Sequence, residues 1–176
     1  MQANKNTSLR RSQRIKLYST GFLTLAIMVF IFIMSARDAE DSSRLSSGFL
    51  TTLIGAFLAR FLPQLSDKGL EYDIRKYAHM FEYFCLAVSS LLFFRELYVR
   101  KLRRGLRAVF SALLLCFVYA CSDEWHQTFV PGRSGRFSDV MVDLAGSLFG
   151  LLFMLLLLAT IRAIRRKKTA LRKAND

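Results

Sequence analysis

A dense block of ionisable and hydrogen-bonding side chains lies between two long apolar stretches of the chain. Residues 123–139 hold three acids, two arginines, a histidine and a glutamine, and a fourth acid, Asp143, follows one helical turn later. A connecting turn needs far fewer polar groups. Such side chains can act as general acids and bases, or hold anions. Ionisable groups at membrane depth are costly and usually functional, so this block is the first candidate site.

The apolar stretches predict a polytopic membrane protein. The 176-residue chain is 53% hydrophobic, with 16 Phe. Each stretch approaches the roughly 20 residues that a helix needs to cross the hydrocarbon. Because lipid offers no hydrogen bonds to the backbone, the spans must be helices. We predict an all-α fold whose four transmembrane helices cover residues 17–36, 77–94, 106–121 and 140–161.

The basic residues predict the orientation. Five precede the first span, six follow the second and seven follow the fourth, which together make 18 of the 26 lysines and arginines. The positive-inside rule places all three groups in the cytoplasm, with both termini. The net charge of +13 is thus a topology signal that attracts anionic lipid headgroups, and no nucleic-acid partner is predicted. The chain divides into a transmembrane domain at 17–161 and basic cytoplasmic tails at 1–16 and 162–176.

A further apolar piece, residues 48–62, lies between the first two spans. Its large apolar residues recur at helical spacing, but it ends at Pro63 and is short for a span. A short interfacial or re-entrant helix on the outer side fits it better. A fifth crossing would place the basic loop at 95–107 outside, against the charge rule.

Polar residues from separate spans are predicted to meet in one layer of the outer half of the membrane. The second span enters from that side, the third leaves there and the fourth re-enters there. Gly146 and Gly150 lie on the face of the fourth span that carries carboxylates, and glycines permit close helix approach. The candidate polar pocket consists of Lys76, His79, Glu82, Tyr83, Asp123, Glu124, Gln127, Arg133, Asp139 and Asp143.

The pocket residues form three motifs, which are Lys76-x-x-His79-x-x-x-Tyr83-x-x-Leu86, Asp123-Glu124-x-x-Gln127-x-Phe129-x-Pro131-Gly132-Arg133 and Asp139-x-x-x-Asp143-x-x-Gly146. Together they resemble the VanZ-like family of bacterial membrane proteins, over about residues 35–152. Asp143 stands where many relatives have asparagine. The resemblance implies a location in the bacterial plasma membrane and a role in resistance to teicoplanin, a lipid-bearing glycopeptide. It does not imply a defined catalytic activity.

Two classes of function stay open. In the first, the protein is a non-catalytic binder or modulator of a cell-envelope component. Lys76, Arg133 and Arg136 would hold an anionic group of a lipid-linked cell-wall precursor or a glycopeptide-related ligand. Arginine suits such groups because its planar fork donates two parallel hydrogen bonds.

In the second class, the protein is a small intramembrane enzyme acting on a lipid-linked envelope precursor. His79 or Glu82 would be the general base, Asp139 or Asp143 a second acid or base, and Arg133 the stabiliser of developing charge. No Gly-x-Ser-x-Gly elbow or other nucleophile motif is present, which favours the binder. The sequence leaves catalysis and oligomeric state open.

A structural network of ion pairs is the plainer interpretation of the same residues. A ligand is favoured over it because the basic groups exceed what Asp139 and Asp143 require. Glu82, Asp123 and Glu124 are available to take up that excess. No cofactor is predicted, and no metal, because no ligand spacing such as His-Glu-x-x-His occurs.

Overall fold

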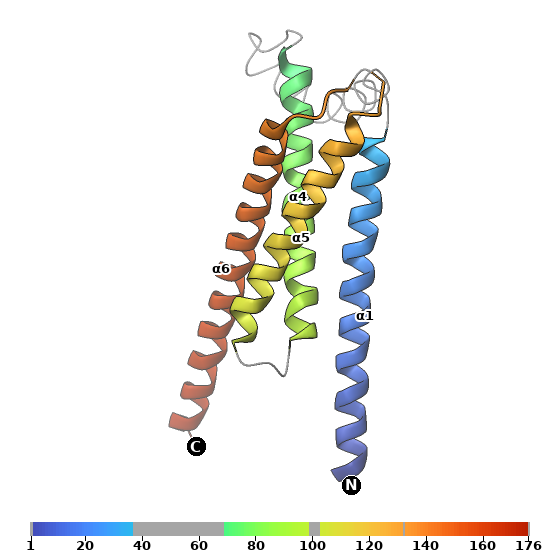
Figure 1. Ribbon diagram of the computed structural model, residues 1–176. Helices are drawn as coiled ribbons and strands as arrows, with labels where there is room; N and C mark the ends of the chain where they lie inside the picture. The colour runs from blue at the N-terminus through green and yellow to red at the C-terminus, as the bar shows by residue number, and fades with distance from the viewer. Residues whose placement is uncertain (1, 37–68, 99–102, 132, 176) are drawn as a thin grey trace.

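The described part of the protein is a bundle of long helices. The computed structural model describes residues 2–36, 69–98, 103–131 and 133–175. Within them there is no strand, and the elements are α1 (Gln2–Ser35), α4 (Gly69–Leu97), α5 (Arg104–Gln127) and α6 (Phe137–Asn175) (Figure 1). The predicted short helix at 48–62 lies outside the described residues.

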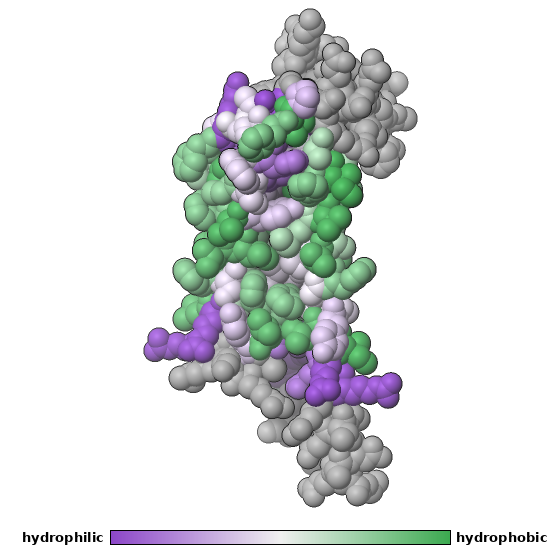
Figure 2. Space-filling model, turned by 45° about the vertical axis from the view of Figure 1, so that its right-hand side comes forward, coloured by the Kyte–Doolittle hydropathy of each residue, from purple (hydrophilic) through white to green (hydrophobic). Residues whose placement is uncertain are grey.

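Each of the four helices is long and apolar enough to cross a membrane. Many large apolar side chains, such as Phe22, Phe110 and Phe149, are exposed on the outside of the bundle. Figure 2 shows them as a band between hydrophilic ends, a surface suited to lipid and exceptional in water. The predicted all-α, four-span class is therefore confirmed, with candidate spans at Arg11–Ser35, Lys76–Leu97, Gly105–Gln127 and Phe137–Arg172.

The helices are longer than the apolar stretches from which we predicted them. α1 begins within the basic N-terminal tail, and α6 continues through most of the C-terminal one. Backbone hydrogen bonds hold a helix regardless of side-chain polarity, so apolarity marks only the part suited to lipid. The same effect carries α5 past residue 121 to Gln127, which makes the start of the polar block helical.

α4 is the central helix, and it packs against α6, α1 and α5, whereas α1 and α5 barely touch. Both chain ends lie at one end of the bundle, where α4 ends and α5 begins (Figure 1). α1 ends and α6 begins at the opposite end, as an even number of spans requires.

Two glycines bring α6 directly onto the backbone of α4. A Cβ added at Gly146 would collide with the carbonyl oxygen of Met80, and one at Gly150 with that of Phe84. Only residues without a side chain allow this approach, which is common between membrane helices. The contact fixes the register that sets Asp139 and Asp143 of α6 beside α4.

The remaining core joins α5 and α1 to this pair. Small residues at four-residue spacing, Ala108, Ala112, Cys116 and Ala120, form the buried face of α5. The hydroxyl of Tyr119 donates a hydrogen bond to the carbonyl of Met28 in α1. These contacts hold the end of α5, with its polar residues, against its neighbours.

Candidate functional site

A polar cavity of about 200 Å³ lies among α4, α5, α6 and the segment that joins α5 to α6. It contains polar groups from helices far apart in the sequence, as the convergence argument predicted. Ser134, Arg136 and Val142 form part of its wall. Seven of the ten predicted pocket residues complete it, namely Lys76, His79, Glu124, Gln127, Arg133, Asp139 and Asp143.

The other three predicted residues lie directly beside this wall. Asp123 is buried, with a ligand atom within 4.8 Å of those of His79 and Asp143. Oε2 of Glu82 lies 3.7 Å from Nδ1 of His79. Tyr83 is completely buried and within electrostatic range of Asp123 and Asp143. The structure thus brings all ten residues into one neighbourhood.

The helical continuation of α5 organises one side of the cavity. Asp123 and Gln127 are one turn apart on the same face, and Nε2 of Gln127 donates to Oδ2 of Asp123 at 3.3 Å. Oε2 of Glu124 accepts a hydrogen bond of 2.8 Å from the backbone N–H of Arg136. That bond folds the α5–α6 segment back over the helix end. Gly135 fits there because it has no Cβ to meet the carbonyl oxygen of Glu124.

Arg133 links this segment to α1 and to the buried acids. Its Nη2 donates to the carbonyl oxygen of Met34, at the end of α1, at 3.4 Å. The guanidinium is within electrostatic range of three acids, Glu82, Asp123 and Glu124. The sequence left these acids open as partners. Each of these acids can balance part of the charge of Arg133, so the structural network remains an alternative to the ligand.

The charges of the cavity are separated by depth. Arg136 is exposed, and the side chains of Lys76 and Asp139 are 33% and 27% exposed, with Nζ and Oδ1 3.8 Å apart. Such a long, half-exposed pair contributes little to stability. Asp123 and Asp143, in contrast, are only 4% and 2% exposed. The basic groups, together with Asp139, therefore lie nearer the rim, whereas Asp123 and Asp143 are buried more deeply.

Other polar-block residues lie outside the cavity. His126 packs its ring against Phe32, 4.7 Å between centroids. Trp125 and Phe129 are both 69% exposed and meet edge to face, as interfacial anchors do. The sequence analysis missed Ser134 and Val142, and Val142 carries no chemistry that a sequence pattern reveals. Arg136 was outside the ten-residue pocket set, although the sequence had suggested it as a residue that holds the anion.

Four apolar helices around a buried, charged cavity define a multi-pass membrane protein whose polar groups are gathered into a site. The family model described as VanZ/LLP1 matches residues 20–158, most of the chain, so the protein belongs to the VanZ/LLP1 family. The resemblance drawn from the three motifs is thereby confirmed. Searches against curated proteins and solved structures give no significant match.

Proposed function

We propose that the protein binds an anionic component of the bacterial cell envelope in this cavity, and that the binding contributes to teicoplanin-type glycopeptide resistance. The observation that carries the proposal is the rim of Lys76, Arg133 and Arg136 on a cavity between membrane helices. Guanidinium and ammonium groups at such a place suit a phosphate or carboxylate.

The surroundings of the rim favour a ligand with an apolar tail. On α4, Tyr77 and Phe81 are 66% and 64% exposed, and on α6, Phe137 and Met141 are 69% and 43% exposed. These residues lie within about one turn of Lys76 or Asp139. If the anionic headgroup of a lipid were bound in the cavity, its hydrocarbon chain would lie against these exposed apolar side chains. A lipid phosphate or a lipid-linked cell-wall precursor has this composition.

Native mass spectrometry of the detergent-purified protein tests the binding. We expect retention of a polyprenyl phosphate, and weaker retention of phosphatidylcholine, because only the former presents an anion without a choline cation. Arg136→Gln should weaken retention about tenfold, which is the loss of one charge-assisted hydrogen bond. Arg165→Gln, at the opposite end of α6, is the matched control and should change nothing. Equal retention by both variants would contradict the proposal, as would unchanged teicoplanin susceptibility of cells carrying Arg136→Gln.

The proposal requires the cavity to face the outer leaflet, which the basic residues predict. In a variant without Cys85, Cys116 and Cys121, single cysteines are introduced at Ser134, Leu102 and Ala170. A membrane-impermeant maleimide added to intact cells should label position 134 only. Labelling at position 102 or 170 in sealed cells would show that the orientation is the opposite of the predicted one.

A second function, catalysis on a lipid-linked precursor, is favoured by one observation. Nδ1 of His79 and Oε2 of Glu82 are 3.7 Å apart, a pairing from which a general base is built. The same mass spectra separate the two functions. A binder retains the precursor at its original mass, whereas an enzyme changes that mass with time, and His79→Gln would stop the change.

A further inference from the structure

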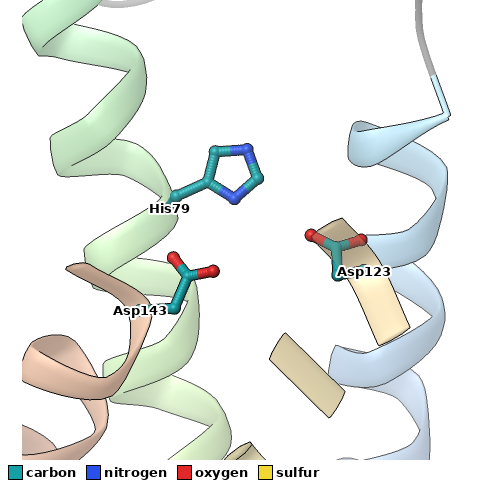
Figure 3. A group of neighbouring side chains, drawn as sticks. All are labelled: His79, Asp123 and Asp143. Carbon is teal, nitrogen blue, oxygen red and sulfur yellow. The ribbon is translucent and has the colours of Figure 1, made fainter. Parts of the chain in front are cut away.

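Three helices each contribute one metal-ligating side chain in or directly beside the cavity. They are His79 of α4, Asp123 of α5 and Asp143 of α6, and Figure 3 shows them pointing into a common space. One ligand atom from each lies within 4.8 Å of the other two. Tetrahedral ligand atoms with bonds of about 2.1 Å lie about 3.4 Å from one another. Side-chain movements of less than about 1 Å therefore suffice to enclose an ion.

The hydrogen bonding of these carboxyl groups is incomplete. Oδ1 of Asp123 and Oδ2 of Asp143 are buried and have no hydrogen-bond partner among the described residues. Ser35 lies near Asp123, but the geometry of its hydroxyl fits no hydrogen bond to a described residue. The buried hydroxyl of Tyr83 also has no hydrogen-bond partner among the described residues. Buried polar atoms are nearly always satisfied, so such a group of atoms indicates an ion or ordered water.

Neighbouring side chains are placed as those around metal ligands usually are. Gln127 donates to Oδ2 of Asp123, which orients that carboxylate and leaves Oδ1 directed elsewhere. Oε2 of Glu82 lies 3.7 Å from Nδ1 of His79, beyond hydrogen-bond distance but near enough for an electrostatic interaction if the ring is protonated. Carboxylates and amides that contact metal-ligating side chains hold those side chains in orientation and strengthen metal binding.

The charge of the cluster favours a cation over water. Around the cavity, the described side chains provide five carboxyl groups, Glu82, Asp123, Glu124, Asp139 and Asp143, and three basic groups, Lys76, Arg133 and Arg136. A buried carboxylate without a counter-charge is strongly unfavourable. With all five carboxyl groups ionised, the described side chains carry an excess of two negative charges, which one divalent ion would neutralise.

We propose that His79, Asp123 and Asp143 bind a divalent transition-metal ion, with Zn²⁺ the first choice and Mn²⁺ the second. Imidazole suits Zn²⁺, carboxylates suit Mn²⁺, and both ions accept this mixed set. Three protein ligands leave a coordination position open, and two of them, His79 and Asp143, line the cavity. There the ion would meet the anionic group held by the rim. We predicted no metal from the sequence because spacing rules detect ligands on one segment, whereas these come from three helices.

Metal analysis of the purified protein is the first test. The full chain, carrying an affinity tag without histidines, is purified in detergent without chelators. We expect about one equivalent of zinc or manganese by mass spectrometry. The stripped protein, treated with EDTA and dialysed, should regain thermal stability when ZnCl₂ or MnCl₂ is added. At an ion concentration about 100 times the Kd, binding should raise Tm by roughly 5 °C or more.

Substitutions then identify the ligands. Asp123→Asn and Asp143→Asn keep the side-chain shape, and each should lower the metal affinity at least about tenfold and remove most of the Tm rise. Glu96→Gln, on α4 but at the end of the helix away from His79, is the matched control and should keep both.

Two results would overturn the proposal. One is that the purified wild-type protein holds less than about a tenth of an equivalent of any divalent metal and that neither Zn²⁺ nor Mn²⁺ raises its Tm. The other is that the metal still raises Tm in the Asp123→Asn and Asp143→Asn variants. The wild-type measurements stand even where a variant fails to fold. All are made without an anionic lipid, so they are independent of the proposed envelope ligand.

Discussion

Gly146→Ala is expected to destabilise the protein more than alanine at Gly21, Gly105 or Gly150, the other helical glycines whose surroundings are known. The new Cβ would overlap the backbone carbonyl oxygen of Met80, which cannot rotate away as a side chain can. Overpacking of this kind costs about 1–3 kcal/mol or more. The better helix propensity of alanine offsets about 1 kcal/mol of that in water. Because 1 kcal/mol corresponds to about 2–4 °C at this chain length, Tm should fall by roughly 5 °C.

Gly105→Ala is the matched control, because a Cβ there meets no atom within 4 Å. Its Tm should be unchanged or slightly higher. The measurement is thermal unfolding of both variants in one detergent, with membrane abundance as a second readout. If Gly146→Ala were as stable as Gly105→Ala, the α4–α6 register would be wrong. The placement of Asp143 beside His79 would be wrong with it.

Arg133→Gln is expected to cause the second large loss, of about 3–5 kcal/mol. Removing one partner from a buried group of charges leaves the others uncompensated, which costs about that much. Here the remaining charges are Glu82, Asp123 and Glu124, and the contact with the carbonyl of Met34 is lost as well. We expect lower membrane abundance and a Tm lower by about 10 °C.

Arg136→Gln is the comparison for this variant, because Arg136 is exposed and engages Glu124 through its backbone N–H. The substitution should leave the fold intact. The pair of variants also assigns roles to the two arginines. A stable Arg133→Gln protein that has lost its envelope ligand would show that Arg133 serves the ligand alone, and would contradict the structural role argued above.

The sequence predicted the membrane class, the four spans and the family because these depend on local composition and on spacing. Long runs of apolar residues indicate segments that contact lipid, and three short motifs were enough to indicate the family. The same features placed His79, Asp123 and Asp143 at one depth. Features that depend on the spacing of residues along one helix could therefore be predicted from the sequence.

The surroundings of individual charges could not be predicted in this way. The contact of Arg133 with Met34 spans 99 residues and depends on how α1 meets the rest of the bundle. Its proximity to Glu82 depends on the α4–α5 packing. The continuation of α5 to Gln127 was also uncertain, because apolarity ends before the helix does. Charge totals alone therefore could not show which acids lie near Arg133.

An experimental structure of the protein purified with native lipid is the most direct test of the central claim, that the cavity binds an anionic envelope component. We predict density for an anionic headgroup within hydrogen-bond distance of Lys76 and Arg136, with its hydrocarbon along the exposed flank of Tyr77 and Phe81. A cavity that holds only water, with lipid headgroups ordered elsewhere on the bundle, would contradict it.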